Sequence, residues 1–139
     1  MQVVELVVVR VQFPETAEES PVVYLKEKEG DRELPIVIGI NEAQSINMAL
    51  SNFKTPRPLT HDLIVDIFKA LGLRLERVVI NDLRENTYFA RLILFDEEHK
   101  TLYSIDARPS DSIAIALRAK APIFVSEYFL KKALSLEGS

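Results

Sequence analysis

The sequence DARPSDSIAIALRAKAPIFV, residues 106–125, decides the fold of this chain. Its central part, Ile113 to Leu117, carries only apolar side chains, so a helix there has no polar face to turn toward water. The segment PIFV that follows, residues 122–125, has the composition of a short buried strand. The stretch therefore predicts a helix that the rest of the fold encloses.

Other stretches of the sequence predict the strands that surround this helix. They are rich in β-branched and apolar residues and are bounded by polar turns, as strands are. A hairpin turn is expected at EKEGDRE, residues 27–33, where Gly30 and Asp31 supply turn chemistry. The predicted strands are Val3 to Val11, Val22 to Lys26, Leu34 to Ile40, Arg74 to Leu83, Thr87 to Phe95 and one that ends near Ile105.

Helical spacing of apolar residues predicts three further helices, after Asn41, Thr60 and Ser126. Each of these polar residues is expected to cap the helix that follows it. Gly72 ends the helix that starts at Thr60, and the prolines in FKTPRPLT, residues 53–60, make that segment a loop.

The order of these elements predicts an α+β fold with a mixed, largely antiparallel sheet and about four helices. A length of 139 residues fits a single domain, residues 1–139. The segment YFARLILF, residues 88–95, is apolar on both faces of its strand. Such a strand is covered on both sides, or on one side by another subunit. We therefore expect a homo-oligomer, with a dimer favoured.

Composition excludes several classes of protein. No apolar run approaches the roughly 18 residues of a membrane span, and the absence of cysteine excludes disulfides, thiolate catalysis and zinc–sulfur sites. We expect a cytoplasmic protein without membrane contact. With 17 basic and 21 acidic residues the net charge is −4, which disfavours tight, non-specific binding of nucleic acid.

Four polar side chains lie at the N-terminal end of the buried helix, those of Asp106, Arg108, Ser110 and Asp111. Backbone N–H groups at a helix start favour an anion such as phosphate. Arg108 could bind an incoming phosphate or pair with Asp111. A purely structural interpretation stays open, in which Ser110 caps the helix and Asp111 complements its dipole.

Two other segments carry residue types that a phosphodiesterase uses. PRPLTHD, residues 56–62, contains Arg57, His61 and Asp62, and INDLRENT contains Asp82. Carboxylates hold hard divalent cations, and arginines bind phosphate. Each residue also has an ordinary explanation as a turn, cap or dipole partner, including Glu42 in the first turn of its helix.

The four segments LPIVIGINEAQSI, PRPLTHDLIVDIFKALGL, VVINDLRENTYFARLIL and DARPSDSIAIALRAKAPIFV together resemble the bifunctional nuclease domain family, long catalogued as a domain of unknown function. The resemblance covers nearly the whole chain and implies cleavage of DNA and RNA. The polar positions that match the family motifs are Glu42, Arg57, His61, Asp62, Asp82, Asp106, Arg108, Ser110 and Asp111.

Two hypotheses follow. In the first, the protein is a metal-dependent nuclease. Its catalytic residues are His61, as base or leaving-group acid, with Asp106 and Asp111. A Mg²⁺ or Mn²⁺ ion is held by Asp106, Asp111, Asp82 and Glu42, and phosphate is bound by Arg57, Arg108 and Ser110. In the second, the protein is a non-catalytic anion-binding or protein-interaction module in which the same polar residues are structural.

Overall fold

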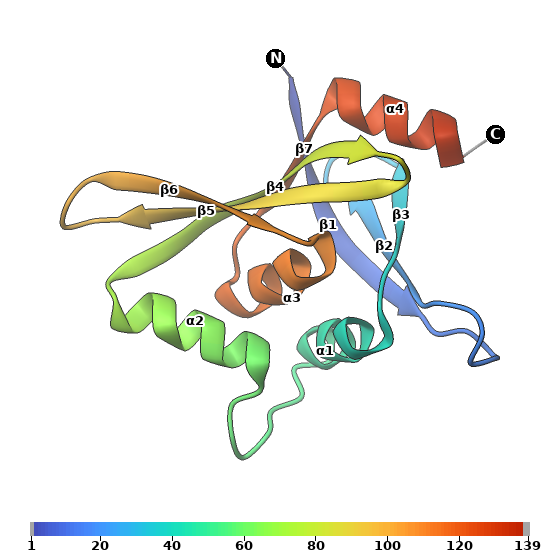
Figure 1. Ribbon diagram of the computed structural model, residues 1–139. Helices are drawn as coiled ribbons and strands as arrows, with labels where there is room; N and C mark the ends of the chain where they lie inside the picture. Colours follow the sequence, from blue (N-terminus) through green and yellow to red (C-terminus); the bar gives the residue numbers. More distant parts are fainter. Residues whose placement is uncertain (1, 138–139) are drawn as a thin grey trace.

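The computed structural model describes residues 2–137 and is drawn in Figure 1. Its strands are β1 (Val3–Gln12), β2 (Val22–Glu27), β3 (Glu33–Val37), β4 (Leu73–Arg84), β5 (Thr87–Asp96), β6 (Thr101–Ala107) and β7 (Ile123–Ser126). Its helices are α1 (Ile40–Leu50), α2 (Thr60–Ala70), α3 (Pro109–Ala119) and α4 (Glu127–Glu137). The predicted α+β class is confirmed.

The strands form one seven-stranded sheet in the order β3-β2-β1-β7-β4-β5-β6. All neighbouring strands are antiparallel except β4 and β7, which pair in parallel through Val78 and Ile123. The long strands β4 and β5 start their pairing with Leu73 opposite Asp96. The mixed, largely antiparallel sheet that the order of elements predicts is therefore present.

The helices lie on both faces of this sheet (Figure 1). Helices α1, α2 and α3 cover one face, and α4 covers the other face over β3, β4 and β7. The strand β5 shows the consequence, because Ala90, Leu92 and Leu94 are buried beneath the α1–α3 layer whereas Phe89 and Ile93 on the other face are only half-buried. The sequence predicts that this strand is covered on both sides or on one side by another subunit; within residues 2–137, its α1–α3 face is the buried one.

Helix α3 lies between the sheet and the helices α1 and α2, which both pack against it. Ile113, Ala114, Ile115 and Ala116 are at most 2% exposed. Burial of each large aliphatic side chain stabilises the fold by about 1.5–3 kcal/mol. The apolar stretch is thus enclosed as its sequence predicts, and its N-terminal end is a firmly held support.

Three helices start earlier than their polar residues predict. The N-cap residues are Gly39, Leu59 and Arg108 rather than Asn41, Thr60 and Ser110. Proline fixes its own φ and lacks an N–H, so Pro109 is suited to the first position of α3, and the N-cap lies two residues before Ser110. Likewise β3 ends at Val37, and Ile40 begins α1 instead of ending a strand.

The cap of the last helix is as predicted, because the hydroxyl of Ser126 accepts a hydrogen bond of 3.0 Å from the N–H of Phe129. Gly72 follows α2 with a φ of +72°, a conformation that glycine adopts readily. Within residues 2–137, no helix is both long and apolar enough to cross a membrane.

Candidate functional site

A groove of about 990 Å³ lies where the helices α1, α2 and α3 meet the edge of the sheet at β5 and β6. Its floor contains apolar side chains such as Phe68, Leu92 and Ile115. The polar side chains that line it include Glu42, Ser45, His61, Asp106, Arg108 and Asp111. A large apolar groove with a few convergent polar groups is the usual form of a ligand site.

His61 is the centre of the polar cluster in this groove. It comes from the first turn of α2, and its side chain is only 9% exposed. Its Nδ1 lies 2.6 Å from the Oγ of Ser45 on α1, and its Nε2 lies 2.9 Å from Oδ1 of Asp111 on α3. One imidazole thus joins three helices.

The ionisation of Asp111 sets the direction of these hydrogen bonds. Burial alone would raise the pKa of Asp111, but hydrogen bonds from His61 and Arg108 and the charge of Arg108 outweigh it and hold the pKa below its usual value. An ionised carboxylate only accepts, so Nε2 of His61 donates to it. In the neutral imidazole, Nδ1 is then an acceptor, and the hydroxyl of Ser45 donates to it.

Arg108 completes the cluster on its solvent side. Its Nε and Nη2 donate to Oδ2 of Asp111 at 3.0 and 2.9 Å, and Nη2 also lies 3.6 Å from Oε2 of Glu42. The hydrogen bonds to Asp111 are the main reason that the pKa of Arg108 is raised. The Arg108 side chain is 67% exposed, so its guanidinium is accessible to an anion in the groove.

A second network fixes the helices behind the cluster. Arg118 of α3 donates from Nε to Oδ1 of Asp62 at 2.8 Å and from Nη2 to the carbonyl of Ser45 at 3.2 Å. Asp62 also accepts from the N–H of Leu59 at 2.9 Å. These bonds join α1, α2 and α3 a second time, and they hold the backbone of Ser45 in place.

The structure brings five of the predicted site residues together. Glu42, His61, Arg108 and Asp111 form the cluster, and Asp106 lines the same groove. Asp106 stands apart from the cluster, because its side chain is 70% exposed and faces Arg91, with 3.8 Å between Oδ1 and Nη1.

Three predicted residues lie elsewhere. Asp82 pairs with Arg84 and is within electrostatic range of Lys132 of α4, so it belongs to the opposite face of the sheet. The hydrogen bond from Arg84 is the main reason that its pKa is lowered. Arg57 is exposed in the 51–59 loop and does not line the groove. Ser110 is buried and faces a separate hollow of about 540 Å³ beside Tyr88.

Ser45 and Arg118 are the two residues that the sequence analysis missed. Both are polar residues placed among buried apolar positions of a helix, and Arg118 follows the all-apolar run of α3. That pattern is the signal that could have identified them, since buried polar groups are nearly always hydrogen-bonded to a specific partner.

The carboxylates that line the groove are not arranged to bind a metal ion. The guanidinium of Arg108 lies between the carboxylates of Glu42 and Asp111, and both oxygens of Asp111 accept hydrogen bonds. Among residues 2–137, no group of three or more His, Asp or Glu side chains is arranged to hold a metal ion.

Comparison of the sequence with known proteins assigns this chain to a family. The family model described as the bifunctional nuclease domain matches residues 23–137. A Mycobacterium tuberculosis protein described only as uncharacterised is 48% identical over 130 residues, which are 94% of this chain and 74% of that protein.

Two plant proteins match with lower identity. "Bifunctional nuclease 1" of Oryza sativa subsp. japonica is 33% identical over 107 residues, 75% of this chain and 32% of the rice protein. "Bifunctional nuclease 2" of Arabidopsis thaliana is 31% identical over 117 residues, 84% of this chain and 36% of that protein. The match therefore covers about a third of each plant protein. This chain belongs to the bifunctional nuclease domain family.

Proposed function

We propose that this protein is a nuclease that hydrolyses phosphodiester bonds of DNA or RNA in the groove between α1, α2 and α3. The names of the plant relatives and the family match support a nuclease. The observation that carries the assignment to this groove is the chain of hydrogen bonds from Ser45 through His61 to Asp111.

The hydrogen bonds define a path for a proton. Both ring nitrogens of His61 are engaged, so a proton from an attacking hydroxyl or water reaches Nδ1 through the hydroxyl of Ser45. Ser45 passes its own proton to Nδ1 as it accepts the new one. Asp111 then stabilises the imidazolium, as a carboxylate does in Ser–His–Asp triads. His61 returns the proton to the leaving oxygen by the same path.

The guanidinium of Arg108 is the group that binds the phosphate in this proposal. It is exposed at the edge of the groove and has donors directed at Asp111 that can be shared with an anion. An arginine placed where charge develops on the phosphoryl oxygens stabilises the transition state. Asp111 therefore has two roles, since it orients His61 with one oxygen and Arg108 with the other.

Dependence on Mg²⁺ or Mn²⁺ stays a prediction. Three carboxylates line the groove, those of Glu42, Asp106 and Asp111, and one arginine, Arg108. With His61 neutral, the net charge of these side chains is therefore −2. A divalent cation would lower the repulsion of phosphate from such a groove. The cation would have to replace Arg108 between Glu42 and Asp111, and no step proposed above passes through it.

The decisive test is cleavage of labelled single-stranded DNA, duplex DNA and RNA by purified protein, with Mg²⁺, with Mn²⁺ and with EDTA. His61→Ala should lower the rate by at least about a hundredfold, the usual contribution of a general base. His99→Ala is the matched control, because His99 pairs with Asp96 in a turn outside the groove. Equal activity of wild type and His61→Ala would assign the cleavage to a contaminant.

The alternative is a module without catalysis, and one observation favours it: Glu42, His61, Arg108 and Asp111 are already paired with one another. In that case no purified preparation cleaves nucleic acid under any of these conditions. His61→Ala would then lower only the melting temperature.

Oligomerisation and cytoplasmic location also stay predictions. The outer face of α2 supports an oligomer, because Leu63, Ile67 and Leu71 are spaced by four residues and are 46–66% exposed. Light scattering of wild type and Ile67→Asp measures whether this stripe joins copies of the chain.

A further inference from the structure

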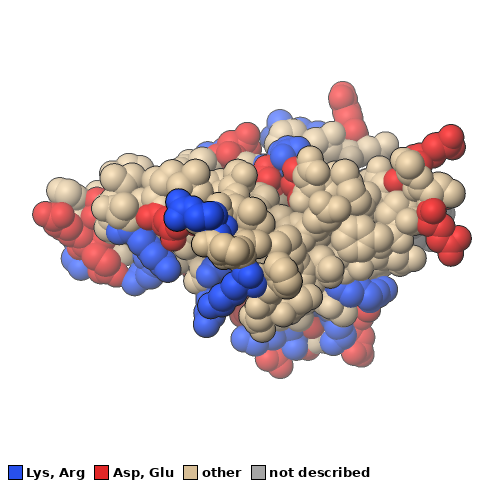
Figure 2. Space-filling model, turned by 90° about the horizontal axis from the view of Figure 1, so that it is seen from below, with Lys and Arg blue, Asp and Glu red and all other residues tan. Residues whose placement is uncertain are grey.

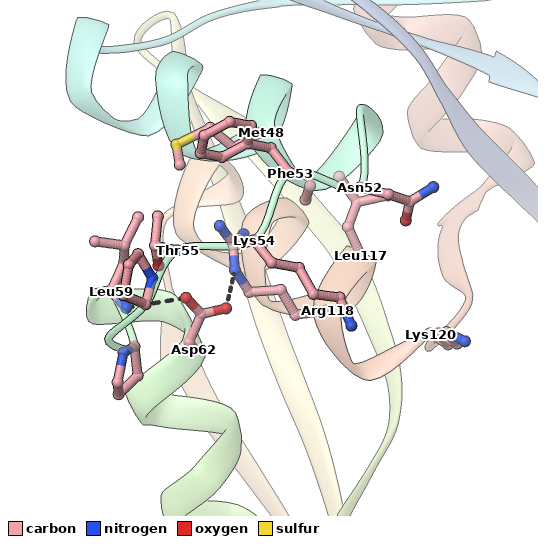
Figure 3. Close-up of a pocket in the computed structure, with 13 residues that line it drawn as sticks. Met48, Asn52, Phe53, Lys54, Thr55, Leu59, Asp62, Leu117, Arg118 and Lys120 are labelled. Atoms are coloured by element: carbon pink, nitrogen blue, oxygen red, sulfur yellow. Dashed lines mark hydrogen bonds and ion pairs between the residues drawn. The ribbon is translucent and has the colours of Figure 1, made fainter.

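A second hollow of about 470 Å³ lies beside the groove, behind the 51–59 loop (Figure 3). It is formed where the C-terminal ends of α1 and α3 meet the start of α2. In Figure 3, Met48 and Phe53 stand on one side of it, with Asp62 and Arg118 near its centre. The dashed lines join Asp62 to Leu59 and Arg118, as described above. Its volume is in the range of small-molecule sites.

The charge of this hollow is opposite to that of the groove. Lys54, Arg118 and Lys120 line it together with a single carboxylate, Asp62, so its net charge is +2 at neutral pH. Arg118 is neutralised by Asp62. Lys54 and Lys120 are exposed and take part in no ion pair among residues 2–137. Two cations are therefore available to an anion.

An exposed aromatic ring accompanies these lysines. Phe53 is fully apolar, yet it is 64% exposed; it lines the hollow, and its ring lies next to Met48 in Figure 3. Aromatic rings beside lysines are how proteins bind single-stranded nucleic acid: the base stacks on the ring and the cations contact the backbone phosphates.

The hollow and the groove are neighbours. Met48, Pro58 and Leu59 line both of them. Arg118 also connects the two. It lines the hollow and donates hydrogen bonds to Asp62, which lines the hollow, and to the carbonyl of Ser45, a residue that lines the groove. The two hollows therefore lie side by side, and we take them to be close enough for one strand to contact both.

The distribution of charge supports a second site beside the groove. The groove with the Ser45–His61–Asp111 chain is itself acidic and repels a polyanion. On the face that Figure 2 draws, Lys and Arg form separate groups, several of them next to Asp or Glu, and no continuous basic surface is seen. The hollow supplies a local attraction next to the groove.

We propose that this hollow is a nucleotide subsite for single-stranded nucleic acid, one that binds a nucleotide flanking the bond placed in the groove. The base stacks on Phe53, and Lys54 and Lys120 contact the phosphates. A base held in a duplex is already stacked and has no free face for Phe53, so single strands are preferred. This inference rests on the proposed nuclease function.

The first test is binding without cleavage. Fluorescence anisotropy measures the affinity of wild-type protein for a labelled six-nucleotide phosphorothioate single strand and for the same sequence as a duplex. Phe53→Ala should weaken single-strand binding about tenfold, the order expected for loss of one stacked base. Lys54→Ala/Lys120→Ala should reduce the slope of log Kd against log salt by about 1.4, since each phosphate contact on a single strand contributes about 0.7.

Matched controls come from the opposite face. Tyr128→Ala removes an aromatic side chain of α4 that is 72% exposed, and Lys131→Ala/Lys132→Ala removes two exposed lysines of the same helix. Both controls should bind as wild type does. The proposal is overturned if wild type does not bind the single strand, if it binds the duplex equally well, or if the controls weaken binding as much as the subsite variants.

The second test separates this proposal from the nuclease assignment. If wild type cleaves single strands, Phe53→Ala and the Lys54/Lys120 variant should raise KM and leave kcat near its wild-type value. Unchanged KM in both variants would overturn the subsite while the nuclease function stands. Binding that depends on Phe53 and the two lysines, in a protein that cleaves nothing, would overturn the nuclease function while the subsite stands.

Discussion

Nε2 of His61 lies 2.9 Å from Oδ1 of Asp111, although the two residues are 50 positions apart in the chain. The other oxygen of Asp111 holds Arg108. The carboxylate therefore orients a base and a cation at the same time. Its removal should affect chemistry and stability together, whereas the loss of an ordinary surface carboxylate affects neither strongly.

Asp111→Asn is expected to abolish measurable cleavage and to lower the free energy of unfolding by about 1–3 kcal/mol, because three hydrogen bonds to a charged carboxylate are weakened in a partly buried site. Cleavage rates and chemical denaturation measure the two effects. Asp82→Asn is the control, since Asp82 is paired with Arg84 away from the groove, and it should cleave as wild type does. An Asp111→Asn protein with full activity would contradict the proposed roles of Asp111.

Ser45→Ala tests the proton path. The substitution leaves Nδ1 of His61 without its hydroxyl donor and removes the group that faces the groove. We expect kcat to fall by about a hundredfold or more while KM changes little, because Ser45 acts in proton transfer and not in substrate binding.

Ser112→Ala is the matched control for this experiment. Ser112 is fully buried, and its hydroxyl donates only to the carbonyl of Arg108, at 2.9 Å. Its loss should lower the melting temperature and leave kcat near the wild-type value. Equal effects of the two substitutions on kcat would show that Ser45 supports the fold alone.

The fold could be predicted from the sequence because its main signals are local. The all-apolar run in α3 and the alternating burial of β5 each follow from the order of neighbouring residues. The starts of α1, α2 and α3 could not be predicted as well. Polar residues that commonly cap helices occur there, but Pro109 and the extended conformations of Gly39 and Leu59 decide where the helices begin.

The site could be predicted only in part, because its geometry depends on contacts distant in sequence. Residue type identified His61, Arg108 and Asp111 as candidates, and their convergence depends on how α2 packs against α3. Asp82 has the same residue type as Asp111, but strand pairing directs it to the opposite face of the sheet. Nothing in the sequence around Ser45 predicts a role in the site, because its partner His61 comes within 2.6 Å only in the folded chain.

Arg32 predicts a pH dependence of stability. It donates to Glu27 of β2 and to Glu127 at the start of α4, with each of these hydrogen bonds at 2.7 Å. The hydrogen bond from the Arg32 side chain is the main reason that the pKa of Glu27 is lowered from 4.5 to about 2, and Arg32 also lowers the pKa of Glu127. A carboxyl whose pKa is lower in the folded state stabilises that state above its unfolded pKa.

The stability that Arg32 contributes should therefore be fully present above about pH 5 and should be lost as the pH falls from 4.5 toward 2. Thermal melts of wild type and Arg32→Met across this range measure it. The difference between their melting temperatures should shrink steadily with acidification. A difference that stays constant to pH 2 would mean that Arg32 acts through packing of its side chain and not through the two carboxylates.

Arg108→Gln tests whether the groove binds a divalent cation in competition with its own arginine. Without the guanidinium, the carboxylates of Glu42 and Asp111 face one another without a cation between them. Mn²⁺ should then raise the melting temperature of Arg108→Gln more than that of wild type, because a ligand that binds only the folded state stabilises it. Glu42→Gln/Arg108→Gln removes one of the two carboxylates and should cancel the gain. If Mn²⁺ shifts none of the three melting temperatures, Glu42 and Asp111 do not form a cation site, and metal dependence of any cleavage would have to arise from the substrate.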